Sequence, residues 1–181
     1  MNTKAPFKAT ESGISAAKTY RPFPIPPRAE IIAWIFSAIL VLLSGLLIER
    51  MGSLPFWASL FTILTLLLAL SIRFSRWLEA NTKIVVDPHA IRYLSPIRKQ
   101  EYDWDQIREM SVNPSGNGWR VFVVGENGGF RFQTETTLQG MRGTRVRTGY
   151  PEGVELVESI LSHADLAEAR FDGTGWEWTK Q

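Results

Sequence analysis

Apolar residues are concentrated in the first half of the chain, in two uncharged runs that are long enough to form membrane-spanning helices. The first run covers residues 31–48 and the second covers residues 54–72. At ~1.5 Å per helical residue each run extends about 27–29 Å, close to the ~30 Å hydrocarbon core of a bilayer. Core helices of a soluble protein would need a larger protein around them than the remaining residues provide. The pattern therefore predicts two transmembrane helices.

The polar segment between the two runs predicts a tight antiparallel hairpin. Residues 49–53 contain Gly52 and precede Pro55, which suits the start of a helix. Lys and Arg are frequent on the two outer flanks of the hairpin, whereas the segment between the runs holds only Arg50. The positive-inside rule then places both termini in the cytoplasm. A cleaved signal peptide is not expected, because a long tail precedes the first run and a second run follows it.

Small and hydroxyl-bearing residues recur at helical spacing in both runs and predict the faces on which the helices pack. Helix backbones in lipid approach closely only where such residues lie between them. The candidate interaction residues are Ser37 and Gly45 in the first run, and Thr62 and Thr65 in the second. Neither run contains an ionisable residue, which speaks against a transporter or a pump.

The tail before the first run shows neither helical nor strand periodicity. Four prolines between residues 22 and 27 favour an extended, polyproline-like backbone. The composition fits a disordered cytoplasmic leader. It also fits a strap that binds a partner protein through residues such as Phe23 and Ile25. The tail is assigned to residues 1–29 and the membrane hairpin to residues 30–77.

From residue 81 onward the period changes to two residues, which predicts β-strands joined by tight turns. Strands are expected at residues 82–87, 90–95, 99–104, 107–113, 119–124 and 130–134, with a weaker strand at 145–148. Pro151 then opens an amphipathic helix whose first turns carry several glutamates. The expected fold is a membrane α-helical hairpin plus an α+β soluble domain at residues 78–166. In that domain a seven-stranded β-barrel or sandwich is capped by a C-terminal helix.

A resemblance to the pleckstrin-homology-like (PH-like) domains of small bacterial membrane proteins is carried by the run KIVVDPHAIRYLSPIRKQEYDWDQIREM. Those domains have a hairpin of the pattern Asp-x-x-Gly/Ala-Ile-x-Tyr, followed by a strand, a tryptophan and an isoleucine. The matching residues here are Asp87, Ala90, Ile91, Tyr93, Trp104 and Ile107. The resemblance covers residues 82–166, and the upstream helix pair also fits that group. Trp104 is expected to be a core residue rather than a ligand-stacking one, because large aromatics anchor small barrels.

The resemblance implies a PH-like fold that binds lipid headgroups, peptides or other proteins. Together with the charge pattern it predicts a multi-pass protein of the bacterial inner (cytoplasmic) membrane. In lipid-binding members, basic residues in the loop between the first two strands hold phosphates. The corresponding loop here is Asp87-Pro88-His89, without Lys or Arg, so phosphoinositide recognition is not expected.

Two further segments carry candidate interaction residues. Arg142, Arg145 and Arg147 lie between glycines in residues 141–149. This segment fits a flexible basic loop that contacts anionic lipid or an acidic partner, and it fits equally a solvated strand edge. The C-terminal tail, residues 167–181, carries Trp176 and Trp178. These aromatic residues are expected to dock, on their own domain rather than on a neighbour, because exposure to water is costly for them.

Composition and motifs argue against catalysis, metal binding and nucleic-acid binding. The chain of 181 residues has a net charge of +2 and no basic stripe of the kind that binds nucleic acid. It has no cysteine, which excludes a thiol nucleophile and a zinc–thiolate site. It also has no glycine-rich phosphate loop, no Gly-x-Ser-x-Gly elbow and no His-Glu-x-x-His motif. We therefore expect no enzymatic activity, no cofactor and no metal.

These observations lead to one main functional hypothesis and one alternative. The main hypothesis is a non-catalytic accessory, assembly or scaffold subunit of a larger bacterial membrane complex, with respiratory and photosynthetic complexes as natural hosts. Its partners would be membrane lipids and other integral membrane subunits. The alternative is a free-standing membrane protein whose PH-like domain binds lipid headgroups or peptides at the cytoplasmic face.

Overall fold

The computed structural model describes residues 7, 17–53, 55–139, 145–166, 169–171 and 173–180. The chain forms two compact units. The helical unit is Ile25–Glu79, and the β unit combines Met1–Pro24 with Ala80–Gln181. Two long apolar helices, a third helix and several antiparallel sheets confirm the expected α+β class. The sheets of the described residues are separate and open, so they do not form a closed barrel.

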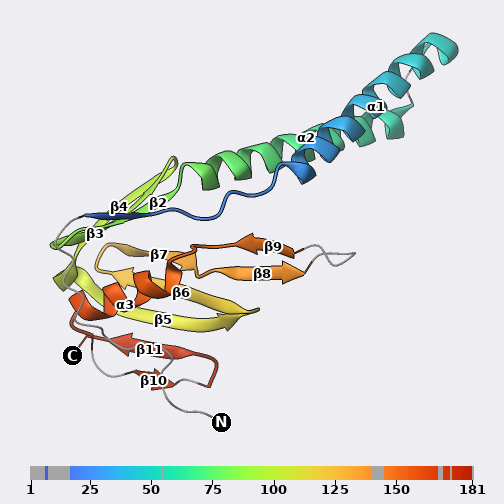
Figure 1. Cartoon of the computed structure of the whole chain (residues 1–181). Helices are drawn as coiled ribbons and strands as arrows, with labels where there is room; N and C mark the ends of the chain where they lie inside the picture. Colours follow the sequence, from blue (N-terminus) through green and yellow to red (C-terminus); the bar gives the residue numbers. More distant parts are fainter. Residues whose placement is uncertain are drawn as a thin grey trace. The chain divides into compact units, whose positions relative to one another are not determined.

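The helical unit consists of two antiparallel helices, α1 (Arg28–Met51) and α2 (Phe56–Ala80) (Figure 1). Helix α1 is capped by Gly52, whose φ of 72° is left-handed and whose N–H donates to the Ile48 carbonyl at 2.8 Å. Glycine suits this position because a side chain there would be strained. Both helices extend beyond the apolar runs into charged residues, since backbone hydrogen bonding does not require apolar side chains.

Small and hydroxyl-bearing residues form the contact between α1 and α2. Ser37 and Ser44 of α1 and Ala58 and Ala69 of α2 are buried. The Ser44 and Thr62 hydroxyls are hydrogen-bonded to each other at 3.0 Å. Close approach at such residues is how helices associate in lipid.

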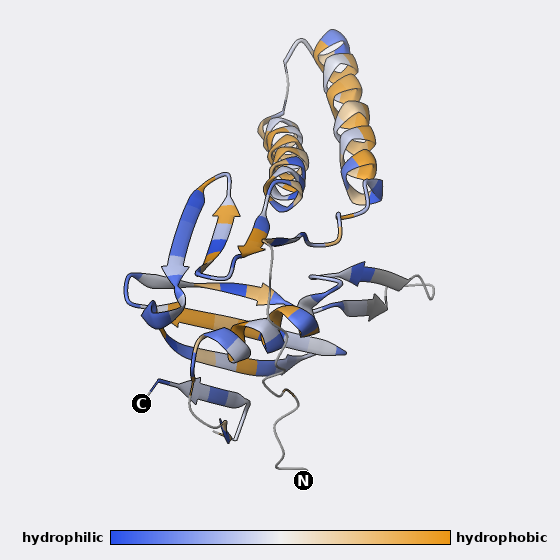
Figure 2. Cartoon of the chain, turned by 60° about the vertical axis from the view of Figure 1, so that its left-hand side comes forward, coloured by the Kyte–Doolittle hydropathy of each residue, from blue (hydrophilic) through white to orange (hydrophobic). Residues whose placement is uncertain are grey.

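Most of the large apolar side chains of the two helices are exposed, and Figure 2 shows many hydrophobic residues along both helices. Phe56 is 82% exposed, and Leu42 is 70% exposed. Among the described residues, α1 and α2 are the helices long and apolar enough to cross a membrane, and little of either is buried inside the structure. A helix exposing this much apolar surface is poorly solvated by water. The two helices therefore suggest association with a membrane.

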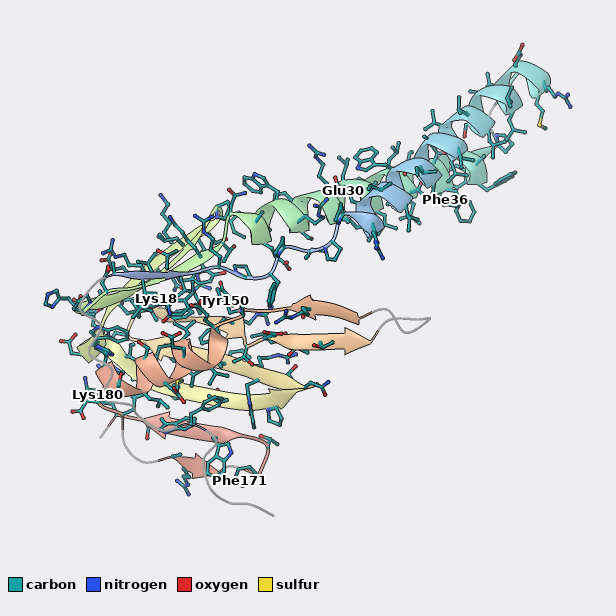
Figure 3. All side chains as sticks on the ribbon, in the orientation of Figure 1. Lys18, Glu30, Phe36, Tyr150, Phe171 and Lys180 are labelled. Atoms are coloured by element: carbon teal, nitrogen blue, oxygen red, sulfur yellow. The ribbon has the colours of Figure 1, made fainter. Side chains whose placement is uncertain are left out.

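Glu30 joins the beginning of α1 to the end of α2 (Figure 3). Its buried carboxylate forms ion pairs with Arg73, at 3.3 Å, and with Arg76. The guanidinium of Arg76 also donates to the carbonyl of Ile25, at 3.3 Å. A carboxylate in the first turn of a helix is favoured by the helix dipole. This cluster fixes the open end of the helix pair.

The first sheet of the β unit has four strands in the order β1-β2-β3-β4. The strands are β1 (Lys18–Tyr20), β2 (Lys83–Val86), β3 (Ala90–Ser95) and β4 (Arg98–Asp103). β1 precedes the helices and β2 follows them, and they pair antiparallel with Lys18 opposite Val86 and Tyr20 opposite Ile84. The sequence predicted no strand in the tail, because three residues are too few to show a period. The tail thus supplies an edge strand to its own domain.

The second sheet has five strands in the order β10-β11-β5-β6-β7. These are β5 (Ile107–Ser115), β6 (Gly118–Gly125), β7 (Gly128–Gln133), β10 (Arg170–Phe171) and β11 (Trp176–Thr179). A 3-10 helix, η1 (Trp104–Gln106), joins β4 to β5, and β8 (Thr136–Gln139) pairs with β9 (Arg145–Thr148) as a separate hairpin. Helix α3 (Gly153–His163) lies along the five-stranded sheet (Figure 1). It begins two residues after the proline that was expected to open it.

The core of the β unit is apolar and lies between the sheets and α3. Its fully buried side chains include Ile84, Ile91, Ile107, Met110 and Leu156. Trp104 is 8% exposed, and its indole N–H donates to the carbonyls of Asp87 and Pro88, each at 3.1 Å. Trp104 is therefore the core residue that the sequence predicted, and it anchors the turn between β2 and β3.

Candidate ligand-binding groove

The β unit contains an open cavity of about 530 Å³ between the β3–β4 hairpin and the β6–β7 hairpin. We call it the Arg98–Arg131 groove. It is lined by Tyr93, Ile97, Arg98, Phe122, Val124, Phe130 and Arg131, with parts of Ser95, Val123 and Gly129. Its volume lies within the ~300–1,000 Å³ that is usual for ligand sites, and an apolar lining with a few polar groups is also usual for them.

The alternation of side chains along β6 and β7 builds the floor of the groove. Val121 and Val123 are buried in the core, so Phe122 and Val124 point to the opposite face of β6. Arg131 pairs opposite Phe122, and Gly129 pairs opposite Val124. Because Gly129 has no side chain, it leaves space beside Val124.

The backbone around Gly129 leaves no room for a side chain at this position. A Cβ atom at Gly129 would lie 2.5 Å from the carbonyl oxygen of Val123, so a larger residue would displace the strand pairing. On the other wall, the ring of Tyr93 stacks on Phe130 with centroids 5.4 Å apart. Aromatic pairs at this separation are favourable beyond their burial. The groove therefore has rigid aromatic walls and a hollow that the main chain maintains.

The charge of the groove is positive. Arg98 and Arg131 are exposed, and no carboxylate of the described residues forms an ion pair with either of them. The described arginines that do have carboxylate partners are Arg73, Arg76, Arg92, Arg108 and Arg147. Two uncompensated guanidinium groups beside an apolar floor favour a ligand that combines anionic and apolar groups.

Polar groups of β4 lie over the start of β7. A Cβ placed on Gly128 would meet the amide nitrogen of Gln100 at 3.3 Å and a guanidinium nitrogen of Arg98 at 3.4 Å. Gln100 also donates to the Tyr102 hydroxyl at 2.6 Å. Burial raises the pKa of Tyr102, and the charge of Arg98 opposes this shift. The phenol therefore stays neutral at physiological pH and adds no negative charge to this end of the groove.

The interaction residues predicted in the two tails contact their own chain. The backbone N–H of Phe23 donates to the Gly149 carbonyl at 2.8 Å, and its ring lies 4.8 Å from the Arg147 guanidinium. Arg147 also forms an ion pair with Glu135, at 2.5 Å. Trp176 and Trp178 are buried on β11, where they pair with Val112 and Met110 of β5.

The basic segment is only partly described. Arg145 lies on β9 opposite Gln139, but its side chain and the whole of Arg142 lie outside the described residues. Arg147 is the member of the three whose contacts are defined, and its guanidinium is already neutralised by Glu135. A strand edge, one of the two expected structures, accommodates Arg145 and Arg147.

The predicted helix residues divide into internal and exposed positions. Ser37 and Thr62 lie at the contact between α1 and α2. Thr65 is half-buried and donates to the Phe61 and Thr62 carbonyls of its own helix. Gly45 is exposed, and a Cβ there would have no atom within 4 Å. Ile25 is half-buried in the helical unit, with its carbonyl bound to Arg76.

Sequence reasoning missed every residue of the Arg98–Arg131 groove as a candidate site residue. One local signal exists, because Ile97 is an apolar residue in a turn beside Arg98 and Lys99, and it is 72% exposed. The other walls come from β6 and β7, and no periodicity reveals that two separate hairpins approach each other.

No metal centre is found among the described residues, where no three His, Asp or Glu side chains gather closely enough to hold an ion. His163 contacts the Ser159 carbonyl at 2.8 Å and the Ser162 hydroxyl at 2.9 Å through Nδ1. Its ring packs on Trp104 with centroids 5.0 Å apart. These contacts give His163 a structural role at the end of α3.

Comparisons of the chain with protein-family models, with curated proteins and with solved structures gave no match. The Arg98–Arg131 groove and the two apolar helices are therefore the features from which a function can be proposed.

Proposed function

We propose that the protein is a non-catalytic accessory subunit of a bacterial membrane complex, anchored by α1 and α2 and binding a partner subunit through its β unit. The Arg98–Arg131 groove is the observation that carries this proposal. It is open and aromatic, and its two arginines have no carboxylate partner among the described residues. Such a surface is suited to recognition, and other integral membrane subunits and membrane lipids are its proposed partners.

The sheet order supports a membrane hairpin. β1 and β2 hydrogen-bond within one sheet, although the two helices separate them in the sequence. If α1 crosses the membrane, α2 must cross back, because strands of one sheet lie on one side. The Lys and Arg residues that flank the hairpin favour the cytoplasmic side for both ends. The proposed location is therefore the bacterial inner membrane.

The strand pattern also supports the PH-like interpretation. In residues 82–166, which carry the resemblance, β2 to β7 lie in two antiparallel sheets, and α3 follows them. The loop between β2 and β3 is Asp87-Pro88-His89, without Lys or Arg. The basic residues that hold phosphate in lipid-binding members therefore have no counterpart in this loop. This arrangement favours binding of a protein over binding of phosphoinositides.

Purification of the full chain in a mild detergent, followed by mass spectrometry, tests the proposed function. We expect another membrane protein to co-purify at fixed stoichiometry. A lone monomer or a homo-oligomer would contradict the accessory role.

A pair of variants on α1 sharpens this experiment. Gly45→Leu adds a side chain at an exposed site without neighbours, so it should leave the helix pair intact while blocking close approach of a partner helix. Leu43→Phe enlarges an exposed residue that lies about 160° around the same helix and serves as the matched control. Loss of the partner from Gly45→Leu alone would identify the face of α1 that it contacts.

One observation favours a second function, which is binding of anionic lipid by a free-standing protein. Ile97 is exposed in a turn with Arg98 and Lys99, a combination that suits the interface of an anionic membrane. The strand register puts this turn beside the start of β2, which follows α2 after two residues. Partner-free protein that binds vesicles containing phosphatidylglycerol through this turn would favour the second function.

A further inference from the structure

We infer that the Arg98–Arg131 groove binds an extended acidic peptide segment of a partner subunit, which adds as a strand to the open edge of β7. This inference rests on the proposed function and specifies its ligand. It combines three observations: an unpaired strand edge, an aromatic hollow beside that edge, and two arginines on opposite walls.

The hydrogen-bonding pattern shows which backbone groups of β7 are open. The N–H of Thr134 donates to the Trp119 carbonyl of β6, at 2.9 Å. In an antiparallel pair, alternate residues direct both backbone groups to the same neighbour. The backbone N–H and C=O groups of residues 128, 130 and 132 therefore point toward β6, as those of Thr134 do. The backbone groups of residues 129, 131 and 133 point away from β6.

Only the first half of that edge is available. The carbonyl of Gln133 accepts a hydrogen bond from the Tyr150 N–H at 2.8 Å, and Thr134 forms a bridge with Tyr150. Gly129 and Arg131 are the outward-facing residues that remain, and β7 is the last strand of its sheet among the described residues. The glycines at 128 and 129 keep the backbone of this edge accessible. An incoming strand would pair along this stretch, as in other examples of strand addition.

The edge of β4, on the other side of the groove, is less suited to pairing. β4 carries Arg98, Lys99, Glu101 and Asp103, which are all exposed. Charged residues along an edge strand discourage the addition of another strand. The peptide is therefore expected to hydrogen-bond with β7 and to face β4 with its side chains.

The spacing of the arginines favours a peptide over a single phosphate. Arg98 lies close to Gly128, and Arg131 is three residues further along β7, or about 10 Å in a strand. One headgroup would be held best by donors that converge on it. Two separated guanidinium groups instead fit two carboxylates on one extended chain. An apolar side chain of the peptide would occupy the hollow beside Val124 and Phe122.

The experiment uses the full chain in phosphatidylcholine nanodiscs and fluorescent heptapeptide pools, with binding read by fluorescence anisotropy. Each position of the acidic pool is Asp, Glu, Leu, Val, Ile or Phe, because the residues that would face Gly129 and Arg131 are two apart and share one face of the added strand. A second pool carries Lys in place of the acids. We expect saturable binding of the acidic pool only. Alternate N-methylation of its backbone should weaken binding about tenfold or more, because strand pairing requires those N–H groups.

Charge reversal tests the groove itself. Arg98→Glu combined with Arg131→Glu should weaken binding of the acidic pool about tenfold or more, since two attractive contacts become repulsive. Arg170→Glu is the matched control, because Arg170 is an exposed arginine on β10 outside the groove, and its binding should equal that of the wild type. Thermal unfolding of each variant verifies that all are folded.

Three results would overturn the inference. These are no saturable binding of the acidic pool by the wild type, equal binding by the double variant, and binding of monomeric dihexanoyl phosphatidylglycerol in place of the acidic pool. Co-purification tests the proposed function separately. A partner that stays bound to the double variant as tightly as to the wild type would preserve the accessory role and refute this ligand.

Discussion

Tyr20 shows how a single residue ties the N-terminal tail to the β unit. It lies on β1 with only 3% of its surface exposed. Lys18, two residues earlier, forms ion pairs with Glu155 at 2.7 Å and Glu152 at 3.0 Å on and beside α3. A tail that buries an aromatic ring and carries such ion pairs is part of the domain.

The pKa shifts of Lys18 and Tyr20 determine how their contributions to stability depend on pH. The hydrogen bond to Glu155 is the main cause that raises the pKa of Lys18, and burial is the main cause that raises the pKa of Tyr20. For both groups the folded state keeps its proton to higher pH than the unfolded state does. Their contributions to stability are therefore complete below the ordinary values of 10.5 and 10.0, and they decline as pH rises above those values.

The substitution Tyr20→Phe separates the phenol from the rest of the site. At about pH 7 we expect a change in stability of no more than about 1 kcal/mol, because the buried hydroxyl has at most one weak contact, with Glu155. Between about pH 10 and pH 11 the wild type should lose more stability than the variant, by at most about 1 kcal/mol, since only the wild type must keep a buried phenol neutral. Tyr102 is present in both proteins, so its effect on stability is the same in each and does not contribute to the difference. Thermal unfolding of the full chain in detergent at the two pH values measures the difference, and equal alkaline losses would contradict it.

Among the elements, those with local sequence signals were predicted closely. β3 is Ala90–Ser95 and β9 is Arg145–Thr148, as the alternation of their residues indicated. The two apolar helices were also predicted. Helix α1 extends three residues beyond its apolar run at each end, whereas α2 begins two residues after the start of its run and ends eight residues beyond it. In these elements the pattern that stabilises the element lies within the element.

The elements that were missed depend on partners far away in the sequence. β1 has three residues and pairs with β2, with Thr19 opposite Val85. β11 is a strand because Trp178 lies opposite Met110 of β5. The C-terminal aromatics were expected to dock on their own domain, yet nothing local showed that they do so as a strand. The Arg98–Arg131 groove was missed for the same reason, since its walls come from two separate hairpins.

A pair of cysteines can test the pairing of β1 with β2, because the natural chain contains none. Facing residues of antiparallel strands have Cα atoms about 4.5–5.5 Å apart, within the range for a disulfide. Thr19→Cys with Val85→Cys should therefore form an intramolecular disulfide under mild oxidation. A protease site at Ser53 reveals it, since the two cleaved halves stay joined until they are reduced.

The matched control for this cross-link is Thr19→Cys with Asn117→Cys, because Asn117 lies in the turn between β5 and β6. Halves that separate without reduction in the Thr19 and Val85 variant would refute the strand pairing. They would also remove the argument that both ends of the helix pair share one side of the membrane.

For the whole molecule, the arrangement of the chain has a consequence for folding. The β unit is built from residues on both sides of the helix pair, and β1 and β2 are joined through α1 and α2. Its first sheet can form only after α2 has been made. The helix pair must therefore bring the two parts of the β unit together for that sheet to form.

The most direct test of this account is the accessibility of single cysteines at Arg21, Ser53 and Asn117, all of which are exposed in the structure. Intact bacterial spheroplasts expressing each variant are treated with a membrane-impermeant maleimide, before and after lysis. The account predicts that Ser53→Cys is labelled in intact spheroplasts, and that Arg21→Cys and Asn117→Cys are labelled only after lysis. Labelling of Arg21→Cys or Asn117→Cys in intact spheroplasts, or protection of Ser53→Cys there, would contradict it.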